Sequence, residues 1–295
     1  MAALTRRQLL TGAAVLAGAA AVYRAPTAFA DSAADAFAAL EHKHNARLGV
    51  FAADLGSPRV VAYRDGERFA MCSTFKAYAS ARVLQMVDRG EARLDTAVPV
   101  ASADIVANSP VTEQAVGATL TLAELCRAAL QQSDNTAGNL LLRTIGGPPA
   151  ITAFAREIGD DQTRLDRWET ELNSALPADL RDTTTAAAFA TGLRALLAGP
   201  VLSQPSRDQL RDWMRGSLTS AARFRAGLPP GWSSADKTGS GDYGTTNDVG
   251  MVFGPDGERF IVAVLSQSRS GDPHAAALNA VVAEATSKVV SSLTA

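Results

Sequence analysis

Lysine, histidine and cysteine are scarce in this chain of 295 residues. The two cysteines, Cys72 and Cys126, are too few to build a disulfide scaffold. The three histidines, His42, His44 and His274, do not have the spacing of a metal site backed by carboxylates. We therefore expect neither a disulfide-built fold nor a histidine metal centre, and we expect no cofactor.

An excess of positive charge is also lacking. The chain has 28 basic and 30 acidic side chains, a formal net charge of −2. Removing residues 1–30, interpreted below as a signal, leaves 25 basic and 30 acidic side chains and a charge of −5. Proteins that bind nucleic acid or anionic membranes through basic patches have the opposite balance. We expect neither partner for the mature chain.

A hydrophobic run long enough for a membrane span is missing. The apolar run over residues 9–22 is shorter than the ~20 residues that a spanning helix needs. It follows the paired Arg6 and Arg7, and small residues around Ala30 come after it. This order predicts an export signal over residues 1–30, of the twin-arginine type, with cleavage after Ala30. A membrane anchor is the alternative. We expect a secreted or periplasmic bacterial protein.

Residue periodicity predicts the order of elements in the rest of the chain. A first helix behind Asp31 or Ser32 precedes the β-prone runs "RLGVFAADL" and "RVVAYR", which "GSPR" joins into a hairpin. The later β-prone runs are "SSADKTGSG", "TTNDVGMVFGP" and "RFIVAVLSQS". Helical spacing predicts helices at residues 73–89, 121–131, 135–145, 148–158, 184–198, 203–215 and 273–293.

This order predicts an α+β fold in which both ends of the chain build one antiparallel sheet. Helices from the N- and C-terminal ends flank the sheet, and an all-helical lobe is inserted between its strands. We predict a sheet-containing subdomain from residues 31–69 and 217–295, and a helical subdomain from residues 70–216. The active site is expected in the cleft where the two meet.

The stretch "MCSTFKAYAS" places one of only four lysines, Lys76, three residues after Ser73. On a helix these two side chains share a face. A lysine in such an apolar run must be paired or lose its proton. Ser73 would lie at a helix start, where free N–H groups favour negative charge. The pair can supply a nucleophile and a base, although this spacing also arises by chance.

Two further motifs make a chance match improbable. "QQSDNTAGN" places Ser133 and Asn135 between two helices, and "ADKTGSGDYG" places Lys237, Thr238 and Gly239 on a strand. Alone, the first reads as a helix cap and the second as a strand that ends in glycines. In this order after the Ser-x-x-Lys pair, they complete the established signature of class A β-lactamases and penicillin-binding proteins.

With these motifs, the mature chain resembles a class A serine β-lactamase over essentially its whole length. "RWETELN" resembles part of the family's Ω-loop, here about residues 164–182, with Glu169 and Asn173 where the hydrolytic water is held. Arg167 and Asp182 match the ion pair at the neck of that loop. The resemblance implies hydrolysis of the amide bond of penicillins and cephalosporins through a serine acyl-enzyme, which confers antibiotic resistance.

The resemblance also implies residue roles. Ser73 would be the nucleophile, and its backbone N–H with that of Ser240 would hold the oxyanion. Whether Lys76 or Glu169 accepts the proton during acylation stays open at this stage. The catalytic residues would be Ser73, Lys76, Ser133 and Glu169, and the substrate-binding residues Asn135, Asn173, Lys237, Thr238, Gly239, Ser240 and Arg223.

Two other functions stay open as alternatives. A peptidoglycan DD-peptidase of the penicillin-binding group shares three motifs but lacks the glutamate matched by Glu169. A non-hydrolytic β-lactam receptor would stay acylated and would need a membrane span after the signal, which the sequence does not predict. The resemblance implies β-lactam antibiotics as ligands, and we expect a monomer.

The sequence departs from the family at several positions. A rim residue that is usually aromatic is Asn108. The family's partner position for Cys126 is Ser80, and that for Cys72 is Gly241, so both thiols are expected to be free. The run "DKTGSGDYGTTND" is similar to that of cefotaxime-hydrolysing members, which implies measurable cephalosporin turnover and poor carbapenem hydrolysis.

Overall fold

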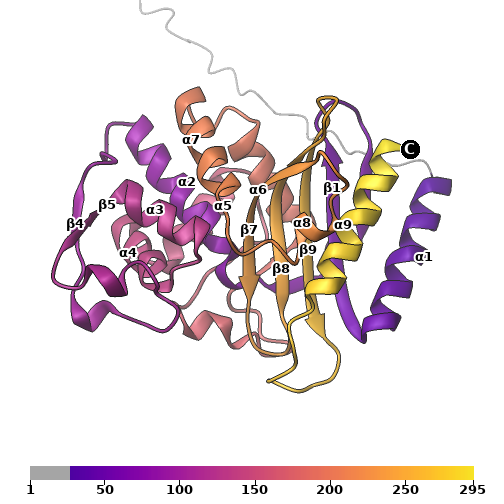
Figure 1. The fold of residues 1–295 in the computed structure, drawn as a ribbon, viewed down its shortest axis with the longest axis horizontal. Helices are drawn as coiled ribbons and strands as arrows, with labels where there is room; N and C mark the ends of the chain where they lie inside the picture. The colour runs from indigo at the N-terminus through magenta and orange to yellow at the C-terminus, as the bar shows by residue number, and fades with distance from the viewer. Residues whose placement is uncertain (1–26) are drawn as a thin grey trace, which may run out of the picture.

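The computed structural model describes residues 27–295. At its centre is one five-stranded sheet with the strand order β2-β1-β9-β8-β7, in which every neighbouring pair is antiparallel (Figure 1). Strands β1 and β9 pair from Ala46 opposite Ser268 to Asp54 opposite Phe260, so both ends of the chain build the sheet centre. The strands are β1 (Ala46–Asp54), β2 (Val60–Tyr63), β7 (Ser233–Ser240), β8 (Thr246–Phe253) and β9 (Arg259–Ser268). The predicted α+β class is confirmed.

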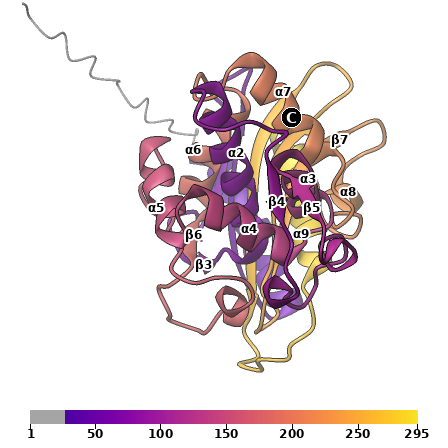
Figure 2. The same ribbon diagram turned by 90° about the vertical axis from the view of Figure 1, so that its left-hand side faces the viewer.

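Helices cover both faces of this sheet. On one face lie α1 (Thr27–His44) and α9 (Asn279–Thr294), on the right of Figure 1, and the short α8 (Phe224–Gly227) packs against α9. The other face carries the helices that follow one another in the middle of the chain, seen from their own side in Figure 2. They are α2 (Phe75–Asp88), α3 (Leu122–Gln131), α4 (Asn135–Ile145), α5 (Pro148–Glu157), α6 (Ala186–Leu197) and α7 (Gln204–Arg215).

Two hydrophobic clusters lie on opposite faces of the sheet, because successive strand residues point to opposite sides. Phe260, Val262 and Val264 of β9 join the cluster under α1 and α9. Ile261, Ala263 and Leu265 join the cluster that fills the helical half. Since the second cluster contains residues of both the sheet and the helices, the predicted division into two subdomains stays a prediction.

Several helix starts differ from the prediction. Helix α4 has the predicted bounds, but α2 begins at Phe75 after a 3₁₀ turn over Cys72–Thr74. Helix α9 begins at Asn279 instead of residue 273. The reason is hydrogen bonding: the Leu278 N–H donates to Thr246 Oγ1 at 2.8 Å, and the Pro273 carbonyl accepts from the Tyr243 N–H at 2.9 Å. Those backbone groups bind the β7–β8 region instead of a further helical turn.

Short elements were not predicted. Strands β3 (Arg68–Ala70) and β6 (Thr183–Thr185) pair with each other, as do β4 (Ala97–Pro99) and β5 (Thr119–Thr121). Three residues are too few to show a period of two. The predicted export signal lies outside the described residues except for its last four, with which α1 begins. Among residues 27–295, no helix is both long and apolar enough to cross a bilayer.

Candidate active site

The predicted nucleophile lies in the tight turn that precedes α2. Ser73 is 6% exposed, and Cys72 before it has a left-handed backbone with φ +48°. Such a conformation costs energy for a residue with a side chain and is common at functional sites. Asn247 of β8 holds the turn, because its Nδ2 donates to the carbonyl oxygens of Ala70 at 2.9 Å and Met71 at 3.2 Å. The sheet therefore fixes the nucleophile's backbone.

Strand β7 lies at the edge of the sheet and is pressed against this turn. A Cβ atom at Gly239 would lie 2.6 Å from the carbonyl oxygen of Met71. At Gly241 it would lie 2.5 Å from the Asn173 carbonyl oxygen and 2.7 Å from Cys72 Sγ. All three distances are shorter than any ordinary Cβ contact, so glycine at these two positions lets the edge strand approach the nucleophile and the Ω-loop.

Lys76 is fully buried beneath the nucleophile. Its Nζ donates to Ser73 Oγ at 2.9 Å, to the Ser133 carbonyl oxygen at 2.7 Å and to Asn135 Oδ1 at 2.6 Å. Glu169 Oε1 lies 3.0 Å from the same nitrogen. Burial lowers the pKa of Lys76, and the charge of Glu169 opposes that shift. All three ammonium protons have acceptors in this arrangement.

Glu169 reaches the nucleophile from the other side. The Ser73 hydroxyl donates to its Oε1 at 2.7 Å, and Asn173 Nδ2 donates to its Oε2 at 2.5 Å. Asn139, one helical turn after Asn135, holds its backbone on both sides. The Glu169 N–H donates to Asn139 Oδ1 at 2.9 Å, and Asn139 Nδ2 donates to the Glu169 carbonyl oxygen at 2.8 Å. Asn139 is not among the predicted site residues, although it lies in the stretch "QQSDNTAGN".

A second buried lysine meets Ser133. The Nζ of Lys237 donates to Ser133 Oγ at 2.9 Å and to the Thr238 carbonyl oxygen at 2.7 Å. Burial and the positive charge of Lys76 hold the pKa of Lys237 well below its ordinary value. Ser133 has a left-handed backbone with φ +57°. The hydroxyl of Thr238 lies 2.6 Å from that of Thr219, a contact that no sequence pattern indicated.

Arg223 connects the edge strand β7 to its neighbour β8. It is 8% exposed, and its Nη1 donates to the carbonyl oxygens of Gly239 and Asn247, both at 2.9 Å. Its Nη2 donates to Ser240 Oγ at 2.6 Å, and its Nε donates to Asn279 Oδ1 at 2.9 Å. The guanidinium therefore lies behind the strand that carries the Lys-Thr-Gly motif and orients the Ser240 hydroxyl.

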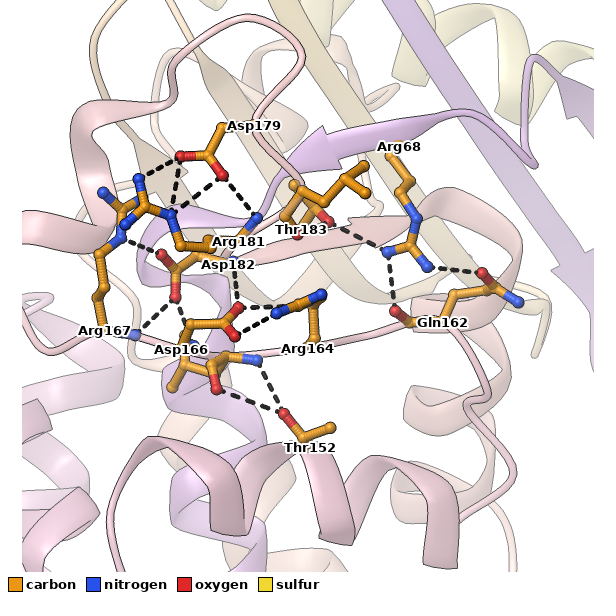
Figure 3. Close-up of polar contacts among 12 residues, drawn as sticks. Arg68, Thr152, Gln162, Arg164, Asp166, Arg167, Asp179, Arg181, Asp182 and Thr183 are labelled. Atoms are coloured by element: carbon orange, nitrogen blue, oxygen red, sulfur yellow. Dashed lines mark hydrogen bonds and ion pairs between the residues drawn. The ribbon is translucent and has the colours of Figure 1, made fainter.

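The neck of the Ω-loop is closed by charged groups (Figure 3). Arg167 Nε donates to Asp182 Oδ2 at 2.6 Å, and the Asp182 side chain is fully buried. Its Oδ1 accepts the backbone N–H groups of Asp166 at 2.7 Å and Arg167 at 2.9 Å. Arg164 pairs with Asp166 at 2.5 Å beside it. Asp182 thus joins the two ends of the loop that carries Glu169.

Both cysteines are buried free thiols, as predicted. Burial raises the pKa of Cys126 to about 12 and raises that of Cys72 as well. At the rim, Asn108 has a left-handed backbone with φ +60°, and its carbonyl oxygen accepts the N–H of Asn135 at 3.0 Å. The rim residue is therefore tied to α4 by its backbone.

Taken together, the side chains come from the turn before α2, the α3–α4 connection, the Ω-loop and the edge strand β7. A serine hydroxyl lies between a carboxylate acceptor and an ammonium donor, and a second lysine holds a second serine. Such an arrangement can carry out nucleophilic attack on a carbonyl and proton transfer to a leaving group.

Solved structures of class A β-lactamases are similar to this chain in fold. The ancestral GNCA class A β-lactamase matches with a TM-score of 0.83 at 49% identity, covering 88% of this chain and 99% of that chain. The β-lactamase from Desulfarculus baarsii gives a TM-score of 0.87 at 43% identity, covering 90% and 98%. The protein has the fold of class A β-lactamases.

Sequence relatives point the same way. β-Lactamase FAR-1 from Nocardia farcinica is 49% identical over 257 residues, which is 87% of this chain and 82% of FAR-1. β-Lactamase CTX-M-8 from Citrobacter amalonaticus is 46% identical over 261 residues, 88% of each chain. The family described as "Beta-lactamase enzyme family" matches residues 32–290. The chain belongs to the β-lactamase enzyme family.

Proposed function

We propose that the protein hydrolyses the β-lactam amide bond of penicillins and cephalosporins through an acyl-enzyme on Ser73, and so confers antibiotic resistance. One observation carries the proposal within this family. The Ser73 hydroxyl donates to Glu169 at 2.7 Å while it accepts from Lys76 at 2.9 Å. DD-peptidases of the penicillin-binding group lack the glutamate, and so its contact with the nucleophile favours a hydrolase.

The hydrogen bonds favour Glu169 as the base of acylation. As an ammonium ion, Lys76 uses all three of its protons on Ser73 Oγ, the Ser133 carbonyl oxygen and Asn135 Oδ1, so in that state it has no lone pair for the proton of Ser73. The Ser73 hydroxyl already points at Glu169 Oε1. Ser73 Oγ attacks the lactam carbonyl as Glu169 receives its proton, and the positive charge of Lys76 stabilises the developing alkoxide. The N–H groups of Ser73 and Ser240 receive the oxyanion.

The leaving nitrogen needs a proton when the C–N bond breaks. Ser133 Oγ accepts from Lys237, so its own hydroxyl proton is free to go to that nitrogen. The proton that Glu169 took from Ser73 passes through Lys76, whose Nζ lies 3.0 Å from Glu169 Oε1, and replaces the one that Ser133 gave. Glu169 is then a carboxylate again before deacylation. Lys237, Thr238 and Ser240 then bind the substrate's carboxylate, and the buried charge of Arg223 adds to their attraction. Asn135 binds the acylamide oxygen.

Deacylation needs a water held between Glu169 and Asn173. Asn173 donates to Glu169 Oε2, and its buried Oδ1 has no hydrogen-bond partner within the part of the chain that the structure describes. That oxygen and the carboxylate can hold a water from two sides. Glu169 takes a proton from the water, the hydroxide adds to the ester carbonyl, and Ser73 leaves with its proton restored.

Mass spectrometry with benzylpenicillin tests the proposal. The parent should return to its unmodified mass within the mixing time while the drug is hydrolysed. Glu169→Ala should keep the mass of the whole drug on Ser73. In the variant Lys76, 2.9 Å from Ser73 Oγ, can still take the serine proton, whereas deacylation loses the base that activates the water and slows by roughly 10²–10⁴-fold. Ser73→Ala should form no adduct. A parent that stays acylated, or a Glu169→Ala variant that turns over like the parent, would refute the proposal.

Export, substrate range and assembly form part of the same proposal. The protein is exported, cleaved after Ala30 and monomeric, and it hydrolyses carbapenems poorly. The intact mass of the protein recovered from the periplasm or medium tests cleavage, since the mature chain should begin at Asp31. Sedimentation velocity tests the monomer. A chain recovered with residues 1–30 attached would overturn the export part alone.

A further inference from the structure

Helix α2 carries a buried tyrosine that the proposed chemistry does not use. Tyr78 lies two residues after Lys76 and is fully buried. Its hydroxyl donates to Asp160 Oδ2 at 2.8 Å and lies 3.3 Å from the Phe189 carbonyl oxygen. A buried hydroxyl that donates to a carboxylate makes a stronger hydrogen bond than one between neutral groups. The contact joins the catalytic helix to a residue 82 positions away in sequence.

The ring of Tyr78 is held in a fixed position. It stacks on Phe189 with ring centroids 4.5 Å apart and planes 2° apart, and it meets Phe154 edge-on at 6.2 Å. A Cβ atom at Gly192 would lie 1.9 Å from the tyrosine oxygen, so glycine at that position leaves room for the hydroxyl. Packing therefore sets where the hydroxyl points before it binds Asp160.

Asp160 lies just before the Ω-loop and draws both ends of that loop together. Its Oδ1 accepts the N–H groups of Gln162 at 3.0 Å and Thr163 at 2.8 Å, and its Oδ2 also accepts the Thr163 hydroxyl. The Thr163 hydroxyl lies 2.6 Å from that of Thr184, on strand β6 at the far end of the loop. Asp160 is fully buried, so this junction is shielded from water.

Strand β3 provides a second connection to the two ends of the Ω-loop. Arg68 Nη1 donates to the Gln162 carbonyl oxygen at 3.0 Å and to Thr183 Oγ1 at 3.1 Å (Figure 3). The nucleophile turn follows β3 directly. The root of the Ω-loop is therefore tied to the elements on both sides of Ser73: to β3 through Arg68 and to α2 through Tyr78.

We propose that Tyr78 is a positioning residue for deacylation, acting through Asp160 on the Ω-loop that carries Glu169. This inference rests on the proposed function. In the free enzyme the Ser73 hydroxyl itself binds Glu169, which holds nucleophile and base together. In the acyl-enzyme that oxygen is esterified and has no proton to donate. The position of Glu169 relative to the ester then depends on the anchors of the loop, and Tyr78 is one of them.

The expected consequence is a change in the ratio of two rates. Acylation begins from a complex in which Ser73 still binds Glu169, so Tyr78→Phe should change its rate by no more than about twofold. Deacylation should slow about tenfold, since a displacement of about 1 Å in a catalytic group can cost roughly 10²-fold. The acyl-enzyme of Tyr78→Phe should therefore accumulate during turnover.

The test is quenched-flow mass spectrometry of benzylpenicillin turnover, at a temperature well below the unfolding midpoint. Tyr63→Phe is the matched control, because the Tyr63 hydroxyl also donates to a carboxylate, Glu41 Oε2 at 3.0 Å, on the opposite side of the sheet. Its two rates should equal those of the parent. Both rates are read from the same folded molecules, so a loss of stability alone leaves their ratio unchanged.

Asp160→Asn provides a second variant. Its amide oxygen can still accept the N–H groups of the turn, but its Nδ2 cannot accept the Tyr78 hydroxyl. It also loses the Thr163 hydroxyl that Asp160 Oδ2 accepts, so it should alter the ratio at least as much as Tyr78→Phe does. The double variant should be no worse than Asp160→Asn alone, because Tyr78 acts through Asp160. A parent-like ratio in both variants would overturn the inference.

Failure of the proposed function would look different. The parent would then stay acylated, or Glu169→Ala would deacylate like the parent. If Glu169→Ala traps the adduct while Tyr78→Phe and Asp160→Asn deacylate normally, the proposed function stands and only the role of Tyr78 is wrong.

Discussion

The two faces of the sheet differ in what they bury. On the face toward α2–α7, apolar packing surrounds the charged side chains of Lys76, Glu169 and Lys237, each with polar partners. On the face toward α1 and α9, the centre is filled by apolar side chains such as Phe37 and Val264. Burial of a charge costs free energy unless it is paired. The second face can therefore supply stability while the first holds the chemistry.

Phe37→Ala should give the largest loss of stability on the second face and tests this division directly. Phe37 lies on α1 and is fully buried in the cluster on the α1 and α9 face of the sheet, the face opposite the cluster around the site. Truncation of a buried phenylalanine typically costs about 3–5 kcal/mol of unfolding free energy. Urea unfolding should show that loss, while kcat/KM of the folded fraction stays within about twofold. Leu180→Ala, at a side chain that is 57% exposed, should change neither quantity much. A parallel fall in kcat/KM would mean that packing on the second face also determines the geometry of the site.

Arg223→Ala probes the place where the second face reaches the site. Arg223 binds Asn279 at the start of α9 and also Gly239 and Ser240 on β7. Its loss removes charge-assisted hydrogen bonds, worth about 1.5–3 kcal/mol each, from the edge strand. We expect kcat/KM to fall by about one to two decades.

Arg215→Ala is the control for that experiment, because Arg215 is 48% exposed and pairs with the exposed Asp212. Its kcat/KM should stay within about twofold of the parent. An unchanged kcat/KM in Arg223→Ala would mean that the hydrogen bonds from Arg223 to β7 are not needed for substrate binding.

Asp248→Asn tests charge on the second face near its β7–β8 edge. Asp236 and Asp248 lie on these neighbouring strands and are both fully buried. Among residues 27–295, Asp236 Oδ2 and Asp248 Oδ1 have no hydrogen-bond partner. Arg225 lies 3.5 Å from Asp236, and Ser220 donates to Asp248 at 2.7 Å. Burial raises the pKa of Asp236, and burial with the charge of Asp236 holds that of Asp248 well above its ordinary value.

The sign of the pH effect follows from proton uptake. Between the unfolded carboxyl pKa of about 3.9 and the raised folded value, the folded chain binds more protons than the unfolded chain. The free energy of unfolding should therefore fall as pH rises, by up to about 1.4 kcal/mol per pH unit for one proton. Asp248→Asn should flatten this slope in urea titrations from pH 5 to 9. Equal slopes in parent and variant would mean that the pair is ionised.

The residues of the site were easier to predict from the sequence than the residues that hold the site in place. Three motifs and one glutamate fix residue types whose chemistry is interpretable from local spacing, and Ser73, Lys76, Glu169 and Ser133 do meet in space. Helix α4 was predicted to the residue because it begins with a capping Asp134 and ends at a left-handed Gly146.

Other features depend on contacts between distant segments. In the sequence Tyr78 looks like an ordinary core residue, and only the structure shows that its hydroxyl binds Asp160. In the same way, Asn139 looks like an ordinary helix residue, and only the structure shows that it binds the backbone of Glu169. Strands β3 and β6 have three residues each, so pairing and not periodicity defines them. The predicted start of α9 was wrong because the backbone before Asn279 binds the β7–β8 region.

Ser240→Ala should have a smaller effect, on specificity. The Ser240 side chain is exposed, and its Oγ accepts from Arg223 at 2.6 Å, so its hydroxyl proton is free for a substrate carboxylate. One neutral hydrogen bond is worth about 0.5–1.5 kcal/mol. The ratio of cephalosporin to penicillin kcat/KM should fall by about three- to fivefold. The exposed Ser270→Ala serves as control, and an unchanged ratio in Ser240→Ala would remove Ser240 from cephalosporin binding.

Lys43→Ala should have the smallest effect. It tests whether burial decides the strength of an ion pair, because an exposed pair can be compared with a buried one. Lys43 Nζ lies 2.8 Å from Glu284, with side chains 60% and 35% exposed, and Arg167 Nε lies 2.6 Å from the fully buried Asp182. Exposed pairs contribute about 0–1 kcal/mol because water solvates both charges. His44 also stays 3.1 Å from Glu284.

We expect Lys43→Ala to change the free energy of unfolding by less than about 0.5 kcal/mol. Arg167→Ala, which leaves a buried carboxylate without its charge partner, should cost about 3–5 kcal/mol. Urea unfolding of the two variants measures the difference. Since the two contact distances are nearly equal, similar costs would mean that burial does not decide the strength of these pairs, and the contrast between the faces of the sheet would lose its physical basis.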